Sequence, residues 1–261
     1  MARFPRIPDL LTTANLACGV GSIFMASQGQ LTTACWLVFA GAFFDVLDGL
    51  AARALGGGTP LGVQLDSLAD MVTFGVAPGM VLYLLAGVPL GSQLVVATMI
   101  SASAPPVDTM LLWMQLIGIA VACIIPIASA WRLAKFNIDT RQTDGFLGLP
   151  TPANALFWAS AGLGLQHLSP EYAVHLGAVS SVGPWMLIVV AVLLGVLMLS
   201  SIPLPSLKFQ HFKWQGNQVI YLLLGIGAVL VILYGILAVP LILLLYLLSP
   251  LWGKLFPKQP A

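Results

Sequence analysis

Long apolar runs recur along the whole chain, and they constrain its fold more than any other feature of the sequence. They lie at about 10–28, 31–55, 63–88, 109–136, 150–167, 178–202, 217–238 and 239–252. A helix needs about 20 mainly apolar residues to cross the hydrocarbon core of a bilayer, and most of these runs approach that length. Membrane-spanning strands would instead alternate between apolar and polar residues. We therefore predict an all-α, polytopic membrane bundle of about eight spans, the last one short.

The scarcity of charge supports the same class of protein. Only 7% of the 261 residues are charged, and 59% are hydrophobic. A soluble globular chain carries about 25% charged residues. This difference excludes a water-soluble domain, a disordered chain and a nucleic-acid-binding protein. The three cysteines all fall within apolar runs, which favours packing roles over disulfides or a zinc site.

The positions of the lysines and arginines predict the orientation. With eight spans, all 10 lie on one side of the membrane, and the opposite connections, near 29–30, 89–108, 168–177 and 238–240, contain none. Positively charged connections stay in the cytoplasm, so both termini are predicted to be cytoplasmic. A ninth span at the weaker apolar run 93–104 would break this pattern, so that run is predicted to be re-entrant or to lie at the surface.

The chain divides into two predicted regions. Residues 1–210 form a catalytic transmembrane domain, and residues 211–261 form a C-terminal helical hairpin and tail. The two halves show no inverted repeat, which weakens a transporter interpretation because many transporters are built from such repeats.

Four of the nine acidic residues fall within two adjacent apolar runs. Asp45 and Asp48 are three positions apart, and Asp66 and Asp70 are four apart, so each pair shares one face of its helix. The short Gly-Gly-Gly-Thr-Pro turn at 56–60 folds the third helix back against the second. The two acidic faces are therefore predicted to meet near the cytoplasmic end. Acidic side chains at membrane depth are costly and usually functional.

The charge of these carboxylates predicts bound cations. Hard divalent cations take oxygen ligands, and Arg53 alone cannot neutralise four negative charges. Two divalent ions could do so and would leave a net attraction for a phosphate-bearing ligand. A pair of metal ions is a common clamp in phosphoryl displacement. A proton or sodium site of a transporter is the alternative, but the position near a helix end and the single tight turn favour the metal site.

Small residues beside the acids leave space against the helix backbone. Gly49 and Gly62 lie within one turn of an acidic residue, and Ala51 and Ala52 lie close by. Together they leave room for a flat group to lie against the backbone. Ordinary helix packing in membranes uses the same small residues, so this interpretation stays open for the glycines.

The spacing of these residues resembles one protein family. The pattern Asp-x2-Asp-Gly-x2-Ala-Arg-x8-Gly-x3-Asp-x3-Asp, which runs from Asp45 to Asp70, resembles the complete signature of the CDP-alcohol phosphotransferases at all eight defining positions. The resemblance implies that an alcohol displaces a CMP leaving group. It also implies a six-helix catalytic core, here followed by two further helices, and a homodimer.

The resemblance assigns roles to the residues of the signature. Asp45, Asp48, Asp66 and Asp70 would hold two divalent cations, Mg²⁺ or Mn²⁺, and Asp70 would also act as general base on the alcohol. The remaining positions would bind the nucleotide: the cytidine site would be lined by Gly49, Ala52 and Gly62, and its phosphate end would be fixed by Arg53.

Further segments resemble the phosphatidylserine synthase branch of that family. They are residues 11–16, 66–79, 132–137, 146–153 and 201–208, so the similarity covers roughly residues 8–210. The resemblance implies CDP-diacylglycerol as donor and L-serine as acceptor. Glycerol phosphate, inositol phosphate or choline as acceptor, and a cation-coupled transporter, are the alternatives. An Asp-rich prenyltransferase is disfavoured by the spacing of the signature.

Three polar residues outside the signature are predicted to bind the substrates. Arg132 and Lys135 are three positions apart and share a helix face, where they could meet a carboxylate and lipid phosphates. Their alternative role is a snorkelling anchor at the helix end. Asn15 is a buried amide near the acids and needs polar partners. We thus expect an integral enzyme of the plasma membrane, with its active site facing the cytoplasm.

Overall fold

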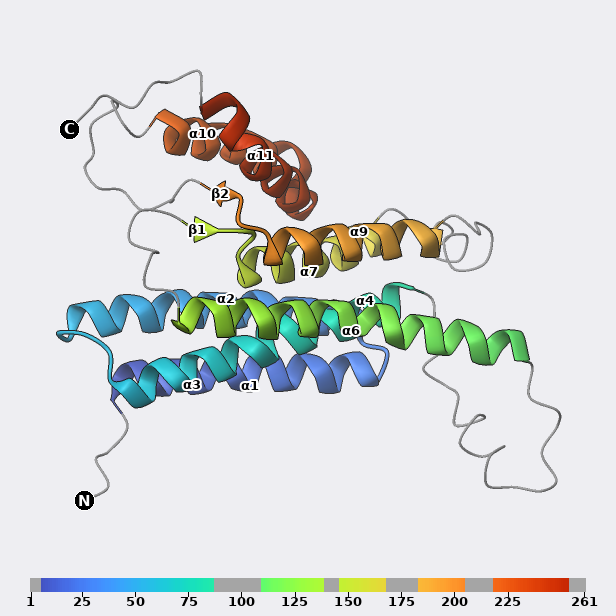
Figure 1. Cartoon of the computed structure of the whole chain (residues 1–261), viewed down its shortest axis with the longest axis horizontal. Coiled ribbons are helices and arrows are strands. Elements are labelled where there is room, and N and C mark those ends of the chain that lie inside the picture. The colour runs from blue at the N-terminus through green and yellow to red at the C-terminus, as the bar shows by residue number, and fades with distance from the viewer. Residues whose placement is uncertain (1–5, 87–108, 139–145, 168–182, 205–217, 254–261) are drawn as a thin grey trace.

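A computed structural model describes residues 6–86, 109–138, 146–167, 183–204 and 218–253 (Figure 1). The helices of the first half are α1 (Ile7–Ser27), α2 (Leu31–Ala54), α3 (Pro60–Asp70), the π-helix η1 (Met71–Val76), α4 (Ala77–Leu85) and α6 (Thr109–Ile138). Those of the second half are α7 (Thr151–His167), α9 (Gly183–Leu199), α10 (Gln218–Tyr234), the 3₁₀ turn η2 (Gly235–Leu237) and α11 (Ala238–Gly253). Two short strands, β1 (Phe146–Leu147) and β2 (Pro203–Leu204), pair antiparallel.

The predicted class, a polytopic helical bundle, is confirmed. Five stretches of the described chain are long and apolar enough to cross a membrane, and a shorter apolar helix follows at Met186–Leu199. The five are Ile7–Ser27, Leu31–Ala54, Pro60–Leu85, Leu116–Ile138 and Gln218–Ser249. The last stretch joins α10 and α11, which the sequence treats as two spans. The predicted re-entrant run 93–104 and the domain boundary at 210 lie outside the described residues.

Helix α1 is the element on which the acidic helices assemble. It packs against both α2 and α3, whereas α2 and α3 make few backbone contacts with each other within the described chain. The short turn had suggested that the backbones of α2 and α3 lie close together, but both helices are instead held mainly by α1. The chain reverses between them at Gly56 and Gly57, whose φ angles of 88° and 106° are readily adopted only by glycine.

Glycines of α1 and α2 let both helices approach η1 closely. A Cβ added at Gly19 of α1 or at Gly41 of α2 would collide with Thr73 of η1. The buried Thr73 hydroxyl donates a hydrogen bond to the Asn15 carbonyl oxygen at 3.0 Å. Glycine at these positions lets three helices meet around one threonine, which is the usual way in which membrane helices approach closely.

A π-helix interrupts the third long helical segment immediately after Asp70. Helix α3 ends at Asp70, η1 occupies the next six residues, and α4 continues the segment to Leu85. Single π-helical turns inside α-helices are frequent at functional sites. Downstream, Gly79 of α4 faces the Ala122 carbonyl and Pro126 of α6, where a Cβ would lie only 2.8 Å from that oxygen.

The remaining helices cover this assembly and bring several helix ends together. Helix α7 packs against α2 on one side and against α11 on the other, and α6 packs against α9. In Figure 1, α1 and α3 begin, and α2 and α6 end, at the same end of the bundle, where α7 also begins. The four described lysines and arginines lie at this end: Arg6, Arg53, Arg132 and Lys135.

Candidate active site

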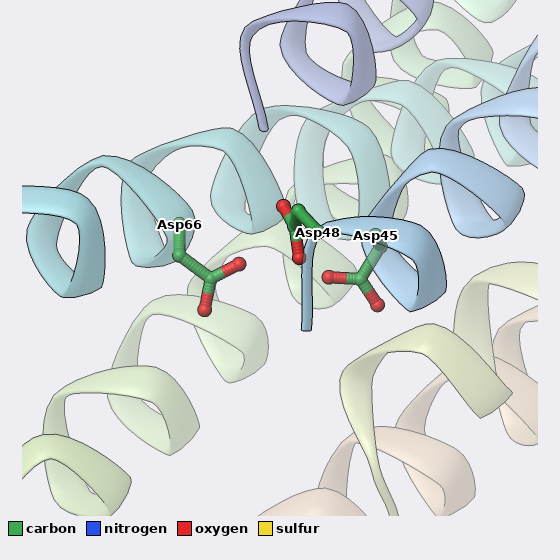
Figure 2. A group of neighbouring side chains, drawn as sticks. All are labelled: Asp45, Asp48 and Asp66. Carbon is green, nitrogen blue, oxygen red and sulfur yellow. The ribbon is translucent and has the colours of Figure 1, made fainter. Parts of the chain in front are cut away.

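Three of the predicted acidic ligands converge in the structure. Asp45 and Asp48 come from α2, and Asp66 comes from α3; each contributes a carboxylate oxygen to a group whose members lie within 4.8 Å of one another. Figure 2 shows the three carboxylates directed toward a common region. Asp48 is buried, with 6% of its surface exposed, and the other two are half-buried. We call these three residues the acidic cluster.

Asp70 adjoins the acidic cluster from the last turn of α3. Its carboxylate lies near that of Asp45. The Asn15 amide nitrogen also lies 3.3 Å from Asp70 Oδ1 and donates to it. Two neighbouring carboxylates repel each other, and a shared proton or a bound cation relieves that repulsion. The fourth predicted acid is therefore next to the cluster, and Asn15 of α1 orients it.

The residues of the acidic cluster fit divalent cations. All the donors are carboxylate oxygens, which are the ligands that hard cations prefer. They come from two different helices, and the mutual repulsion of three closely spaced carboxylates is relieved by a bound positive charge. The structure thus contains an acidic group that could bind a metal ion.

Thr12 is a site residue that the sequence analysis missed. Its hydroxyl donates a hydrogen bond to Asp48 Oδ2 at 2.6 Å, and both side chains are buried. A hydrogen bond from the second layer of residues fixes the orientation of a carboxylate ligand. Thr12 lies three positions before Asn15, and the two therefore share a face of α1. The helical period could have identified Thr12 once Asn15 had been recognised.

The predicted nucleotide-binding residues occupy different environments. A Cβ added at Gly49 would meet nothing within 4 Å, so this part of α2 faces open space beside Asp48. Ala52 is half-buried and Arg53 is exposed at the end of α2. Gly62 lies in a tight contact, where a Cβ would come within 2.9 Å of Asp9 Oδ1.

The two basic residues of α6 that were predicted to bind substrate differ in burial. Arg132 is buried with 8% of its surface exposed, whereas Lys135 is exposed. Arg132 Nη1 lies 3.5 Å from the Thr151 hydroxyl of α7, and the guanidinium also interacts electrostatically with Asp70. Arg132 therefore reaches the acidic site, while Lys135 lies on the outside of the bundle at the end of the helix.

A second polar contact joins α3 to the end of α6. The Asn137 amide nitrogen donates to the Ser67 hydroxyl at 3.0 Å, and this bond lies at an exposed position. It links the helix that carries Asp66 and Asp70 to the helix that carries Arg132. The contact is therefore a polar link, at the surface, between the acidic and basic helices of the site.

Comparison with known proteins places the chain in a family. Residues 6–197 match the family model described as CDP-alcohol phosphatidyltransferase. The CDP-diacylglycerol–serine O-phosphatidyltransferase of Helicobacter pylori is 34% identical over 86% of this chain and 81% of its own. The Bacillus subtilis protein of the same name is 33% identical over 79% and 91%.

A solved structure is also similar to the chain. It is the Mycobacterium tuberculosis phosphatidylinositol phosphate synthase with CDP-DAG bound. It covers 74% of this chain and 84% of its own at 25% identity, with a TM-score of 0.42.

Proposed function

The chain belongs to the CDP-alcohol phosphatidyltransferase family, and we propose that it transfers a phosphatidyl group from CDP-diacylglycerol to L-serine, releasing CMP. The names of the two curated relatives support serine as the acceptor. The observation that carries the proposal is the convergence of the acidic cluster, Asp70 and the buried Arg132 at one end of the bundle. The apolar helices and this site together indicate an integral membrane enzyme.

Asp70 is the residue that we assign as general base. The serine hydroxyl oxygen attacks the phosphorus of the phosphatidyl group, its proton passes to an Asp70 carboxylate oxygen, and the phosphorus–oxygen bond to CMP breaks. Asn15 keeps the Asp70 carboxylate oriented for this transfer through its 3.3 Å hydrogen bond. A base must lie within hydrogen-bond reach of the proton that it removes, and a fixed orientation favours this.

The acidic cluster and Asp70 would hold the divalent cations. Two Mg²⁺ or Mn²⁺ ions there would supply positive charge that neutralises the diphosphate of the donor and the departing CMP. Thr12 fixes the orientation of Asp48 in this set. The open space beside Gly49 suits the cytidine ring, and the exposed Arg53 suits the nucleotide end of the donor.

The experiment that tests the function is CMP release by the purified protein. CDP-diacylglycerol is supplied with serine, glycerol phosphate, inositol phosphate or choline, each with and without a chelator. We expect chelator-sensitive release with serine. If CMP is released with one of the other alcohols but not with serine, that alcohol is the acceptor. If no CMP is released with any alcohol, the proposed enzyme activity is wrong.

Arg132→Ala is expected to raise the KM for serine far more than that for CDP-diacylglycerol. A hydrogen bond from a charged group to a carboxylate contributes about 1.5–3 kcal/mol, which corresponds to roughly 10- to 150-fold in binding. Steady-state kinetics with each substrate varied in turn give the two constants. Lys135→Ala, which removes the exposed cation of the same helix end, should change the serine KM less than about twofold. If the serine kinetics of Arg132→Ala are unchanged, Arg132 does not bind serine and serves only as a basic residue that keeps this helix end in the cytoplasm.

We propose that the active site and both termini face the cytoplasm and that the enzyme works in the plasma membrane as a homodimer. The described lysines and arginines support the orientation, because they gather at the end of the bundle that carries the acids. Positively charged connections remain cytoplasmic.

Site-directed labelling tests this orientation. Gln28 lies in the turn before α2 and Gly58 in the turn after it, and both are exposed. Each is replaced by cysteine in a chain whose native cysteines are alanine. An impermeant thiol reagent added to whole cells should label Gln28→Cys, and it should label Gly58→Cys only after the cells are opened. Labelling of both positions in intact cells, or of Gly58→Cys alone, contradicts the orientation.

A further inference from the structure

The Asn15 side chain, which orients the proposed base, has a hydrogen-bond partner at only one end within the described chain. Its amide nitrogen donates to Asp70 Oδ1 at 3.3 Å, whereas no described residue donates to its amide oxygen. Hydrogen bonds from nitrogen to oxygen are usually about 2.7–3.2 Å long, so this one is long. The orientation of the Asn15 amide therefore depends also on its backbone and on the side chains packed around it.

Thr73 of η1 holds the backbone of Asn15. The Thr73 hydroxyl donates a hydrogen bond to the Asn15 carbonyl oxygen at 3.0 Å, and both residues are completely buried. Thr73 follows Asp70 by three positions, in the π-helix that begins directly after the acid. The three residues thus form a closed ring of contacts. The amide of Asn15 meets Asp70, its carbonyl meets Thr73, and one turn of backbone joins Thr73 to Asp70.

Two glycines hold Thr73 in this ring from opposite sides. A Cβ added at Gly19 of α1 would collide with the Thr73 hydroxyl and would lie 2.8 Å from its Cα atom. A Cβ added at Gly41 of α2 would collide with the Thr73 methyl group and would lie 3.0 Å from Asn15 Oδ1. Protein interiors are close-packed, and a threonine side chain has few rotamers. Thr73 is therefore confined by packing, and the same packing confines the amide of Asn15.

We propose that Thr73 is a positioning residue for the general base, acting on Asp70 through Asn15. The inference rests on the proposed function, because it takes Asp70 as the group that removes the serine proton. The hydroxyl of Thr73 holds the Asn15 backbone, and the Asn15 amide holds a carboxylate oxygen of Asp70. A base acts only when it is held within reach of the proton that it removes. Loss of the Thr73 hydroxyl should therefore slow the chemical step and leave substrate binding unchanged.

The test compares Thr73→Val with Thr73→Ser in the full-length enzyme. Valine has the shape of threonine but cannot donate a hydrogen bond, whereas serine keeps the hydroxyl and lacks the methyl group that faces Gly41. Thr73→Val should lower kcat for CMP release about 3- to 10-fold, the range for one lost hydrogen bond, with both KM values unchanged. Thr73→Ser should keep the wild-type kcat, although the missing methyl group lowers its stability.

Two measures keep this comparison independent of folding. Each kcat is expressed per CDP-diacylglycerol site counted by calorimetry, so unfolded protein does not contribute. Thr73→Ala and Thr73→Ser repeat the comparison without the methyl group, and they differ only in the hydroxyl. If Thr73→Val does not fold, Thr73→Ala should still show the lower kcat relative to Thr73→Ser.

Ser22→Ala is the matched control for the loss of a buried hydroxyl. The Ser22 hydroxyl of α1 donates to the Ala34 carbonyl oxygen of α2 at 2.8 Å, which is also a buried bond from a side chain to the backbone of another helix. Ser22 lies toward the end of α1 that is opposite the acids (Figure 1). Ser22→Ala should lower stability but leave kcat and both KM values unchanged.

A double-mutant cycle asks whether Thr73 acts through the Asn15 amide. Asn15→Ala keeps the backbone carbonyl that Thr73 contacts but lacks the amide that contacts Asp70. In this background Thr73→Val still removes the same hydrogen bond, yet it should have no further effect on kcat. Any effect of the hydroxyl on stability alone would persist there.

Four results overturn the positioning role. They are a wild-type kcat in Thr73→Val, an equal loss of kcat in Thr73→Val and Thr73→Ser, a rise in KM without a fall in kcat, and full additivity in the cycle. Each of them leaves serine-dependent CMP release by the wild type intact. Absence of that release would instead overturn the proposed function, and the inference with it.

Discussion

Asp70→Asn is expected to lower the rate of CMP release by about 10²–10⁴-fold while CDP-diacylglycerol binding stays measurable. Asparagine has the size of aspartate and keeps one ligand oxygen, so the cation site loses charge but not its shape. Asn15 lies 3.3 Å from this position and can still hydrogen-bond to the amide oxygen. The asparagine side chain cannot take up the serine proton, whereas the wild-type carboxylate both binds the cations and accepts this proton. Calorimetry measures the binding of CDP-diacylglycerol, and assays of CMP release measure the turnover rate.

The comparison variant for this prediction is Asp45→Asn. Asp45 belongs to the acidic cluster, so its substitution should weaken nucleotide binding and turnover together. If Asp70→Asn turns over near the wild-type rate, another group takes the proton. If it loses nucleotide binding as completely as Asp45→Asn, Asp70 serves only as a ligand.

The surroundings of Asp70 explain why the base is assigned to it and not to a member of the acidic cluster. It is the residue that ends α3 before the π-helix η1, and it is the acid to which Asn15 donates. Arg132, the predicted partner of the serine carboxylate, also interacts with Asp70. In the described part of the chain, no histidine or glutamate lies at this end of the bundle to compete for the role.

The sequence predicted the helices and the convergence of the acids because both depend on short-range periodicity. Apolar runs define helices of membrane length without any knowledge of their packing. Spacings of three and four residues place Asp45 with Asp48 and Asp66 with Asp70 on single helix faces. Since one short turn joins the two helices, few arrangements keep the acids apart.

The contacts made by α1 could not be predicted in the same way. The sequence suggested that α3 folds directly onto α2, but α1 holds both helices, and Gly19 and Gly41 admit Thr73 between them. Such contacts depend on the shape of small residues, which leave no periodic signal in a uniformly apolar chain. The π-helix after Asp70 was missed for the same reason, because η1 has no distinctive composition.

Gly62 shows a further limit of local patterns. Gly62 matches a signature position, which implied a place in the cytidine site, yet the structure places it against Asp9 and Thr59. Close packing of the starts of α1 and α3 accounts for a glycine there without any ligand. The nucleotide role of Gly62 stays a prediction.

Removal of divalent cations is expected to abolish CMP release, and Asp48→Asn should make the enzyme require far more cation. Chelation should remove activity, and added Mg²⁺ or Mn²⁺ should restore it in the wild type. Asp48 is the most buried member of the acidic cluster, and Thr12 fixes its orientation at 2.6 Å. Loss of its charge leaves the cations with fewer anionic ligands in a site where water cannot readily replace them. We expect turnover at a fixed cation concentration to fall by more than about 100-fold.

Asp9→Asn and Thr12→Val provide the matched comparisons for this cation requirement. Asp9 is an acid of the same region that lies outside the acidic cluster, and asparagine can still accept its hydrogen bond from the Arg6 amide. Its half-maximal cation concentration should therefore match that of the wild type. Thr12→Val removes only the hydroxyl that orients Asp48, and such outer contacts contribute about 10- to 100-fold in metal affinity. An equal cation requirement in Asp9→Asn and Asp48→Asn would show that general negative charge at this end of the bundle, and not coordination by Asp48, sets the affinity.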